Sequence, residues 1–82
     1  MTLKTLLVMP VLKNTWVKEI ELAFPPFQGL GIRLDVYEVF NVDSVVVGDP
    51  HYDVTCIGQL EGGEITEQQC RRLGFEEGVY PL

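Results

Sequence analysis

The sequence predicts an α+β domain that is mostly β: an antiparallel meander or a small open barrel of four to five strands, with one short C-terminal helix packed on it. Two observations support this class. Apolar and polar residues alternate with a period of two over much of the chain, as in half-buried strands. Near the C-terminus, Thr66 and Gln69 have the spacing of a helix capping box. We expect one domain, residues 1–82, because a chain of 82 residues cannot build a second core.

The first half of the chain is expected to supply two strands and a loop. Residues 3–12 are almost continuously apolar, which suits a strand buried on both faces. Pro10 cannot donate a hydrogen bond, so it predicts a bulge or an edge position there, and Lys13-Asn14 predicts a tight turn. Residues 15–24 could form a helix or a strand, but their residue types favour a strand.

Turn chemistry divides the middle of the chain. Two prolines and two glycines make residues 24–31 a loop. Residues 31–40 alternate well and predict a strand with one wet face. The remaining predicted elements are a turn at 41–44, a short strand at 45–47, a turn at 48–51, and a return strand at 52–60 that ends at Gly62-Gly63.

The C-terminal helix is the clearest local signal. The hydroxyl of Thr66 and the amide of Gln69 are placed to satisfy free N–H groups at its start. Gly74 suits a left-handed C-cap, after which Phe75 can pack back on Cys70. Such a helix has about two turns and must lie on the sheet to be stable. Residues 76–82 are expected to form a tail.

Composition limits the classes of partner. Hydrophobic residues make up 46% and charged residues 22%, which is typical of a folded chain. With 12 acidic and 6 basic residues and a net charge of −6, direct binding to nucleic acid or to an anionic membrane is not expected. A basic protein partner is compatible with this charge.

No apolar run approaches the ~18 residues of a membrane span. The N-terminal residues lack the pattern of a signal peptide, so we expect a cytoplasmic protein with reduced cysteines.

The stretch GDPHYDVTC, residues 48–56, contains the only histidine of the chain. In a strand, His51 and Asp53 point away from the face that Tyr52, Val54 and Cys56 give to the core. His51 and Asp53 are therefore candidate residues for a ligand or metal site, and two further residues could join them, namely Asp49 and Tyr37. No helical His pair or CxxC motif supplies further ligands, so turn chemistry explains the stretch equally well, and no cofactor is expected.

The segment FPPF is the second candidate site. It consists of Phe24, Pro25, Pro26 and Phe27. Either both rings enter the core, or one ring stays exposed on the stiff loop and anchors a partner.

Elsewhere, Cys56 and Cys70 are expected to be two separate core thiols, because a cytoplasmic protein seldom forms a disulfide.

These features favour a small, acidic, non-enzymatic protein that acts as a protein–protein interaction or adaptor module. A homodimer is expected because so short a chain buries little of its own surface. The dimer could use the FPPF loop, an exposed sheet edge, or both. One alternative is a small-molecule or metal-ion binding protein, or a minor enzyme, with a pocket near His51 and Asp53. Another is an acidic inhibitor of a nucleic-acid-binding protein, which would present these carboxylates: Glu19, Glu21, Asp35, Glu38 and Asp43.

Overall fold

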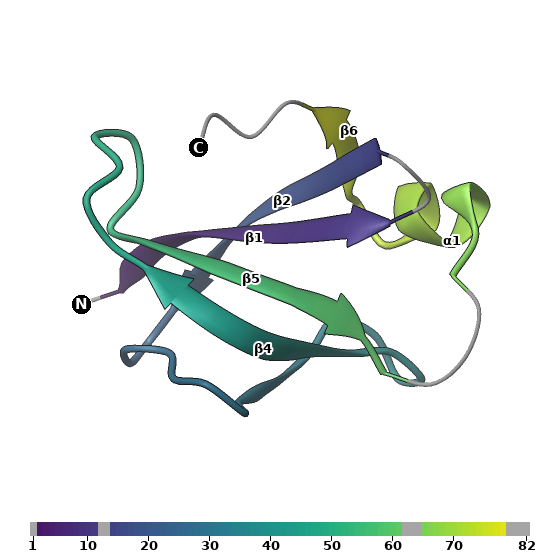
Figure 1. Cartoon of the computed structure of the whole chain (residues 1–82). Helices are drawn as coiled ribbons and strands as arrows, with labels where there is room; N and C mark the ends of the chain where they lie inside the picture. Colours follow the sequence, from purple (N-terminus) through teal and green to yellow (C-terminus); the bar gives the residue numbers. More distant parts are fainter. Residues whose placement is uncertain (1, 12–13, 62–64, 79–82) are drawn as a thin grey trace.

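The fold is seen in a computed structural model, which describes residues 2–11, 14–61 and 65–78. Six strands form one mixed, open sheet in the order β3-β4-β5-β1-β2-β6, and one short helix lies at one end of it (Figure 1). The elements are β1 (Leu3–Val11), β2 (Asn14–Leu22), β3 (Gly31–Arg33), β4 (Val39–Val46), β5 (Val54–Leu60), α1 (Glu67–Arg72) and β6 (Glu76–Gly78). The prediction of a mostly-β fold with a short helix near the C-terminus is confirmed.

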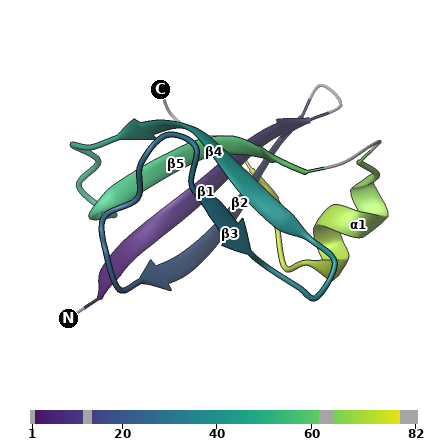
Figure 2. The ribbon, with the colours of Figure 1, turned by 90° about the horizontal axis from the view of Figure 1, so that it is seen from below.

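The predicted antiparallel meander or barrel of four to five strands is wrong. The sheet is open and has six strands, and β1 lies parallel to β5, with Thr5 opposite Val54 and Val8 opposite Ile57. Figure 2 shows β1 and β5 side by side in the middle of the curved sheet. The prediction failed because it paired strands that follow each other in sequence. A strand as apolar as β1 is better suited to the centre of a sheet, where both its faces can be covered.

The hairpin of β1 and β2 explains how Pro10 is accommodated. The strand predicted at 15–24 is observed as β2, Asn14–Leu22. In the hairpin, Pro10 of β1 lies opposite Thr15. The ladder between β1 and β5 extends only to Val8, so the edge of β1 that faces β5 is already unpaired at Pro10. The missing N–H therefore costs no ladder bond, and the predicted edge position is confirmed.

The predicted strand at 31–40 and turn at 41–44 are wrong. The chain forms a hairpin in which β3 ends at Arg33, a loop follows, and β4 runs through the predicted turn to Val46. Ile32 lies opposite Phe40, and both are buried. The alternation of apolar and polar residues therefore continues from one strand of the hairpin into the next, and it was interpreted as a single strand. The loop is closed by the Leu34 amide, which donates to the Glu38 carbonyl at 2.9 Å.

The predicted helix ends are confirmed. Thr66 caps α1, and its hydroxyl accepts from the Gln69 amide at 3.1 Å while the Gln69 side chain accepts from the Thr66 amide at 3.0 Å. At the other end Gly74 has a φ of +90°, and the Phe75 amide donates to the Cys70 carbonyl. This bond and the one from the Gly74 amide to the Arg71 carbonyl, at 3.1 Å, form a Schellman motif that turns the chain back toward the sheet.

The predicted C-terminal tail is partly wrong, because Glu76–Gly78 form β6 and pair with Thr15–Val17 of β2. The rest of that tail, 79–82, lies outside the described residues. So do Lys13 of the predicted turn and the predicted strand end at Gly62-Gly63.

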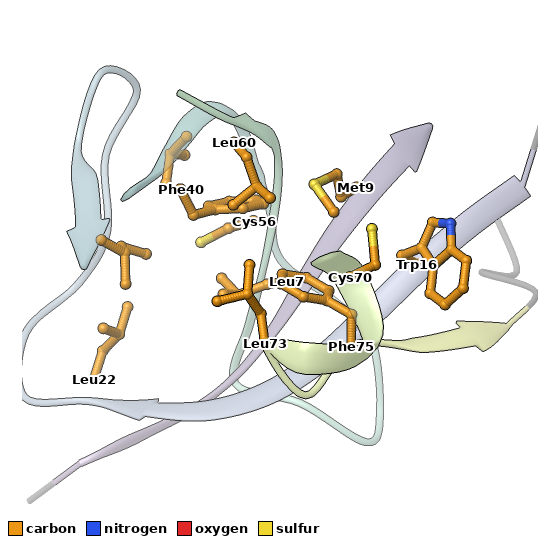
Figure 3. Packing of buried hydrophobic residues seen from close by; sticks show 12 residues of the cluster. Leu7, Met9, Trp16, Leu22, Phe40, Cys56, Leu60, Cys70, Leu73 and Phe75 are labelled. Atoms are coloured by element: carbon orange, nitrogen blue, oxygen red, sulfur yellow. The ribbon is translucent and has the colours of Figure 1, made fainter. Parts of the chain in front are cut away.

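One face of the sheet carries the main core. Figure 3 shows Phe75, Leu73 and Cys70, from α1 and the residues after it, among sheet residues such as Leu7. The Phe40 and Phe75 rings stack with centroids 6.4 Å apart. The other buried members of this cluster are Met9, Trp16, Leu22, Ile32, Val42, Cys56 and Leu60. Within the described residues, no helix has the length and hydrophobicity of a membrane span.

Candidate interaction surface

The GDPHYDVTC stretch is organised as a turn. Asp49 accepts a hydrogen bond from the His51 amide through Oδ1 at 2.8 Å, which is an Asx-type turn contact. Asp53 accepts from the Lys4 amide through Oδ2 at 2.8 Å, and its own amide donates to the Lys4 carbonyl at 2.9 Å. Both carboxylates thus hold the turn and attach it to β1. As predicted, Val54 and Cys56 are buried while His51 and Asp53 are exposed. The prediction is wrong for Tyr52, which is only half-buried: β5 begins at Val54 and not at residue 52, and the Tyr52 ring lies beside Lys4 Nζ, outside the main core.

The four residues predicted for a ligand or metal site do not form one site. Tyr37 lies in the loop between β3 and β4, beside α1, where Glu38 pairs with Arg72 at 3.6 Å. The turn between β4 and β5, which contains His51, lies at the opposite end of the sheet and is attached to β1 through Asp53 (Figure 1). Among the residues that the structure describes, no three His, Cys, Asp or Glu side chains are arranged to hold a metal ion.

An open groove of about 280 Å³ lies elsewhere, beside β1 and β2. It is lined by Leu6, Val17, Lys18, Glu19, Tyr52, Gly74 and Glu76, and so by none of the four predicted ligand residues. Its lysine is already engaged, because Lys18 Nζ donates to the Leu73 carbonyl at 2.7 Å. Glu19 pairs with Lys4 at 3.5 Å. Two of the ionisable side chains of the groove are therefore already engaged with other groups.

The two cysteines are free and buried, as the sequence predicted. Burial raises the pKa of the Cys56 thiol to about 11. The pKa of Cys70 is also raised, first by burial and then by the charge of Glu67. Thiols held in their protonated form inside a core are poor nucleophiles and poor metal ligands. Cys56 and Cys70 are thus packing residues.

The acidic side chains named for the inhibitor alternative occupy separate places. Glu19 and Glu21 lie on β2, Asp35 and Glu38 on the loop between β3 and β4, and Asp43 on β4. The sheet order places β2 and β4 three positions apart, with β5 and β1 between them. These described carboxylates form no continuous acidic stripe, which is the surface that this alternative requires.

The FPPF loop buries a proline and exposes both rings. Pro26 is buried, whereas the exposed fractions of Phe24 and Phe27 are 49% and 56%. The loop is fixed to the sheet beyond these rings, since the Gly29 amide donates to the Val42 carbonyl at 2.8 Å. The interpretation with both rings in the core is therefore wrong, and the structure exposes both rings where the other interpretation expected one.

The second half of β4 lies at the border of the sheet. On the side away from β5, β3 pairs with Val39–Asn41, and Val42 bonds to Gly29 and Leu30. Beyond Val42, the ladder partners of β4 belong to β5 alone, as far as the chain is described. Figure 2 shows the loop between β2 and β3 beside β4, with the end of β4 extending past it. We call residues 43–47 the free edge of β4.

A bulge leaves the valines of this free edge exposed. The β4–β5 register shifts between Val42 and Ser44. Before the shift, the burial of β4 alternates; after it, all residues to Val46 are exposed. The exposed fractions are 37% for Val45, 39% for Val46 and 74% for Val47. An exposed run of β-branched apolar residues on an unpaired edge is the feature that natural sheets usually avoid.

Sequence reasoning predicted a short strand at 45–47 but not that its outer side is unpaired. The available signal was the run of three valines without a lysine or proline, the residues that commonly protect an edge. Comparisons with known proteins add nothing to this surface, because no protein-family model, curated protein or solved structure matches the chain.

Proposed function

We propose that this protein is a non-enzymatic protein–protein interaction module that acts as a homodimer, and that its contact surface is the free edge of β4 together with the exposed rings of Phe24 and Phe27. The observation that carries the proposal is the edge at Ser44, Val45 and Val46, which has no described strand on its outer side and exposes two valines. Backbone N–H and C=O groups on such an edge supply affinity when another strand is added to the sheet.

The composition of the free edge supports this role. It has the sequence DSVVV, in which Asp43 is the only charged residue. Interface centres are depleted of charge and rich in apolar and aromatic side chains. Phe24 and Phe27 lie on the loop that joins β4 at Val42, next to where the free edge begins. An added strand can bury part of these rings as well as the valines, which stabilises a chain with a small core.

The test is the molar mass in solution, measured by size-exclusion chromatography with light scattering over a range of concentrations. We expect the wild-type protein to form dimers as its concentration rises. The variant Val45→Lys places a charge in the middle of the free edge and should weaken dimerisation at least about tenfold. Tyr37→Lys is the matched control: it adds the same charge to a side chain that is 87% exposed, in the loop beside α1, and should behave like the wild type.

Two results would contradict the proposal. One is a wild-type protein that stays monomeric at millimolar concentration. The other is dimerisation that Val45→Lys leaves unchanged while Tyr37→Lys disrupts it, since the contact would then lie at the opposite end of the sheet. Far-UV circular dichroism of both variants verifies that the sheet is retained.

A further inference from the structure

We infer that the free edge of β4 pairs antiparallel with the same edge of a second copy in one particular register, with Val45 on the two-fold axis. This inference rests on the proposed function and adds to it the identity of the added strand and its alignment.

The free edge is limited at both ends. On one side Val42 already exchanges two hydrogen bonds with the loop, because its amide donates to the Leu30 carbonyl at 2.9 Å and its carbonyl accepts from Gly29. On the other side Gly48 has a φ of +109°, which takes the chain out of the strand conformation. A partner strand therefore has only residues 43–47 to pair with.

Symmetry then leaves few alignments. When two identical strands pair antiparallel about a two-fold axis, one residue lies opposite its own copy, and the others pair at equal distances on either side. Within the regular part of the free edge that residue is Ser44, Val45 or Val46. The three alignments differ in what they place opposite Val42 and Asp43.

Only the alignment centred on Val45 satisfies both limits. Centring on Ser44 sets Val46 of one copy against Val42 of the other, whose edge is already occupied by the loop. Centring on Val46 sets Ser44 against Gly48, where the chain leaves the strand conformation, so Asp43 has no strand partner. Centring on Val45 pairs all five residues of the free edge and leaves no like charges opposite.

The pairs in this alignment are chemically compatible. Val45 packs against its own copy, a cross-strand pair of β-branched side chains, and Ser44 lies opposite Val46. Asp43 lies opposite Val47, at the rim. Joining the two edges would make one continuous sheet from both six-stranded sheets. The second copy is favoured over an unrelated strand because every residue of this edge finds an acceptable partner in its own sequence.

A five-residue edge with two neighbouring rings is a small interface, so the dimer should dissociate on dilution. A disulfide cross-link can trap it. Two residues opposite each other in a strand pair have Cα atoms about 4.5–5.5 Å apart, which suits a disulfide. The variant Val45→Cys should therefore form a covalent dimer under mild oxidation. The native cysteines should not interfere, since both are buried.

Val47→Cys is the matched control. In the proposed register the two copies of residue 47 are four positions apart along the ladder, about 13 Å, which is too far for a disulfide. Yet Val47 is more exposed than Val45, 74% against 37%, so random collisions would cross-link it more readily. We expect at least about fivefold more covalent dimer from Val45→Cys, read on a non-reducing gel.

A second measurement keeps the test valid if Val45→Cys does not fold. Ser44 and Val46 are opposite each other in the proposed register. A mixture of Ser44→Cys and Val46→Cys proteins should thus cross-link better than either variant alone.

The possible failures can be told apart. If Val47→Cys cross-links as well as Val45→Cys while light scattering shows a dimer, the register is wrong and the proposed function stands. If a dimer forms but neither the position-45 variant nor the mixture cross-links, another surface or another alignment makes the contact. If the wild-type protein is monomeric and no variant cross-links, both proposals fail.

Discussion

Replacing Gly58 with alanine should be the most damaging small change in this sheet. Gly58 lies in β5 opposite Val42, on the side that faces the core. An added Cβ would overlap the carbonyl oxygen of Asn41 and would lie 2.9 Å both from the Asn41 carbonyl carbon and from Phe40 Cε1. The first two atoms belong to the backbone of β4, which cannot move without opening the ladder between β4 and β5.

These contacts determine how much unfolding free energy the substitution should remove. Overpacking by a methyl group usually costs 1–3 kcal/mol, and more where the neighbours cannot shift. We therefore expect Gly58→Ala to lower the free energy of unfolding by about 3 kcal/mol or more. Because a small domain has only about 5–10 kcal/mol in total, a substantial part of its stability would be lost. Urea unfolding followed by far-UV circular dichroism measures this difference.

Gly78→Ala is the matched control. Gly78 is also a strand glycine, in β6, but there the nearest atom to an added Cβ is Val17 Cγ2 at 3.5 Å, an ordinary van der Waals distance. Its free energy of unfolding should stay within about 0.5 kcal/mol of the wild type. If the free energy of unfolding of Gly58→Ala lies within about 1 kcal/mol of the wild-type value, the close approach of Asn41 to Gly58 is wrong. The β4–β5 register, on which the free edge depends, is then wrong as well.

Two further changes test the helix cap and the buried thiol. Thr66→Ala removes the capping hydroxyl and should cost about 1 kcal/mol of unfolding free energy, whereas Thr66→Ser should restore most of it; equal stabilities of the two variants would contradict the cap. Because burial raises the pKa of Cys56 from 9.0 to about 11, the unfolded chain loses this proton first. The free energy of unfolding should therefore be unaffected by this group below about pH 9 and should fall toward about pH 11. Urea titrations at about pH 8 and about pH 10 measure that fall, which Cys56→Ala should reduce.

Local chemistry predicted the elements that depend on neighbouring residues. The capping pair Thr66 and Gln69 and the glycine at position 74 determine where α1 begins and ends, and both signals lie within a few residues of the helix. The residue types over 15–24 favoured the strand β2 for the same reason. In each case the physical cause is short-ranged, so the sequence shows it directly.

The strand order could not be predicted in this way. The pairing of β1 with β5 joins residues some fifty positions apart, and Thr5 carries no mark that its neighbour is Val54. The hairpin of β3 and β4 was concealed because Ile32 and Phe40 both contribute to the core on the two sides of the loop. A period of two indicates which face is buried but not where a strand turns back.

The candidate surface was only half visible in the sequence. Residues 24–27 can fold with their rings inside or outside, and the loop chemistry is the same in both cases. Which one occurs depends on the tertiary contact between Gly29 and Val42, which fixes the loop on β4. The exposure of Val45 depends similarly on the bulge after Val42, which has no local sequence signature here.

The position of β6 has a consequence for the synthesis of the protein. β6 covers the start of β2, and Asn14 Nδ2 donates to Glu77, 63 residues later in the chain. A polypeptide made from its N-terminus therefore has β1 and β2 long before their neighbours β5 and β6 exist. Until then both borders of that hairpin are unpaired and the apolar face around Trp16 is uncovered. The growing chain should be most prone to misassembly on the ribosome, after β2 has emerged and before β5 has.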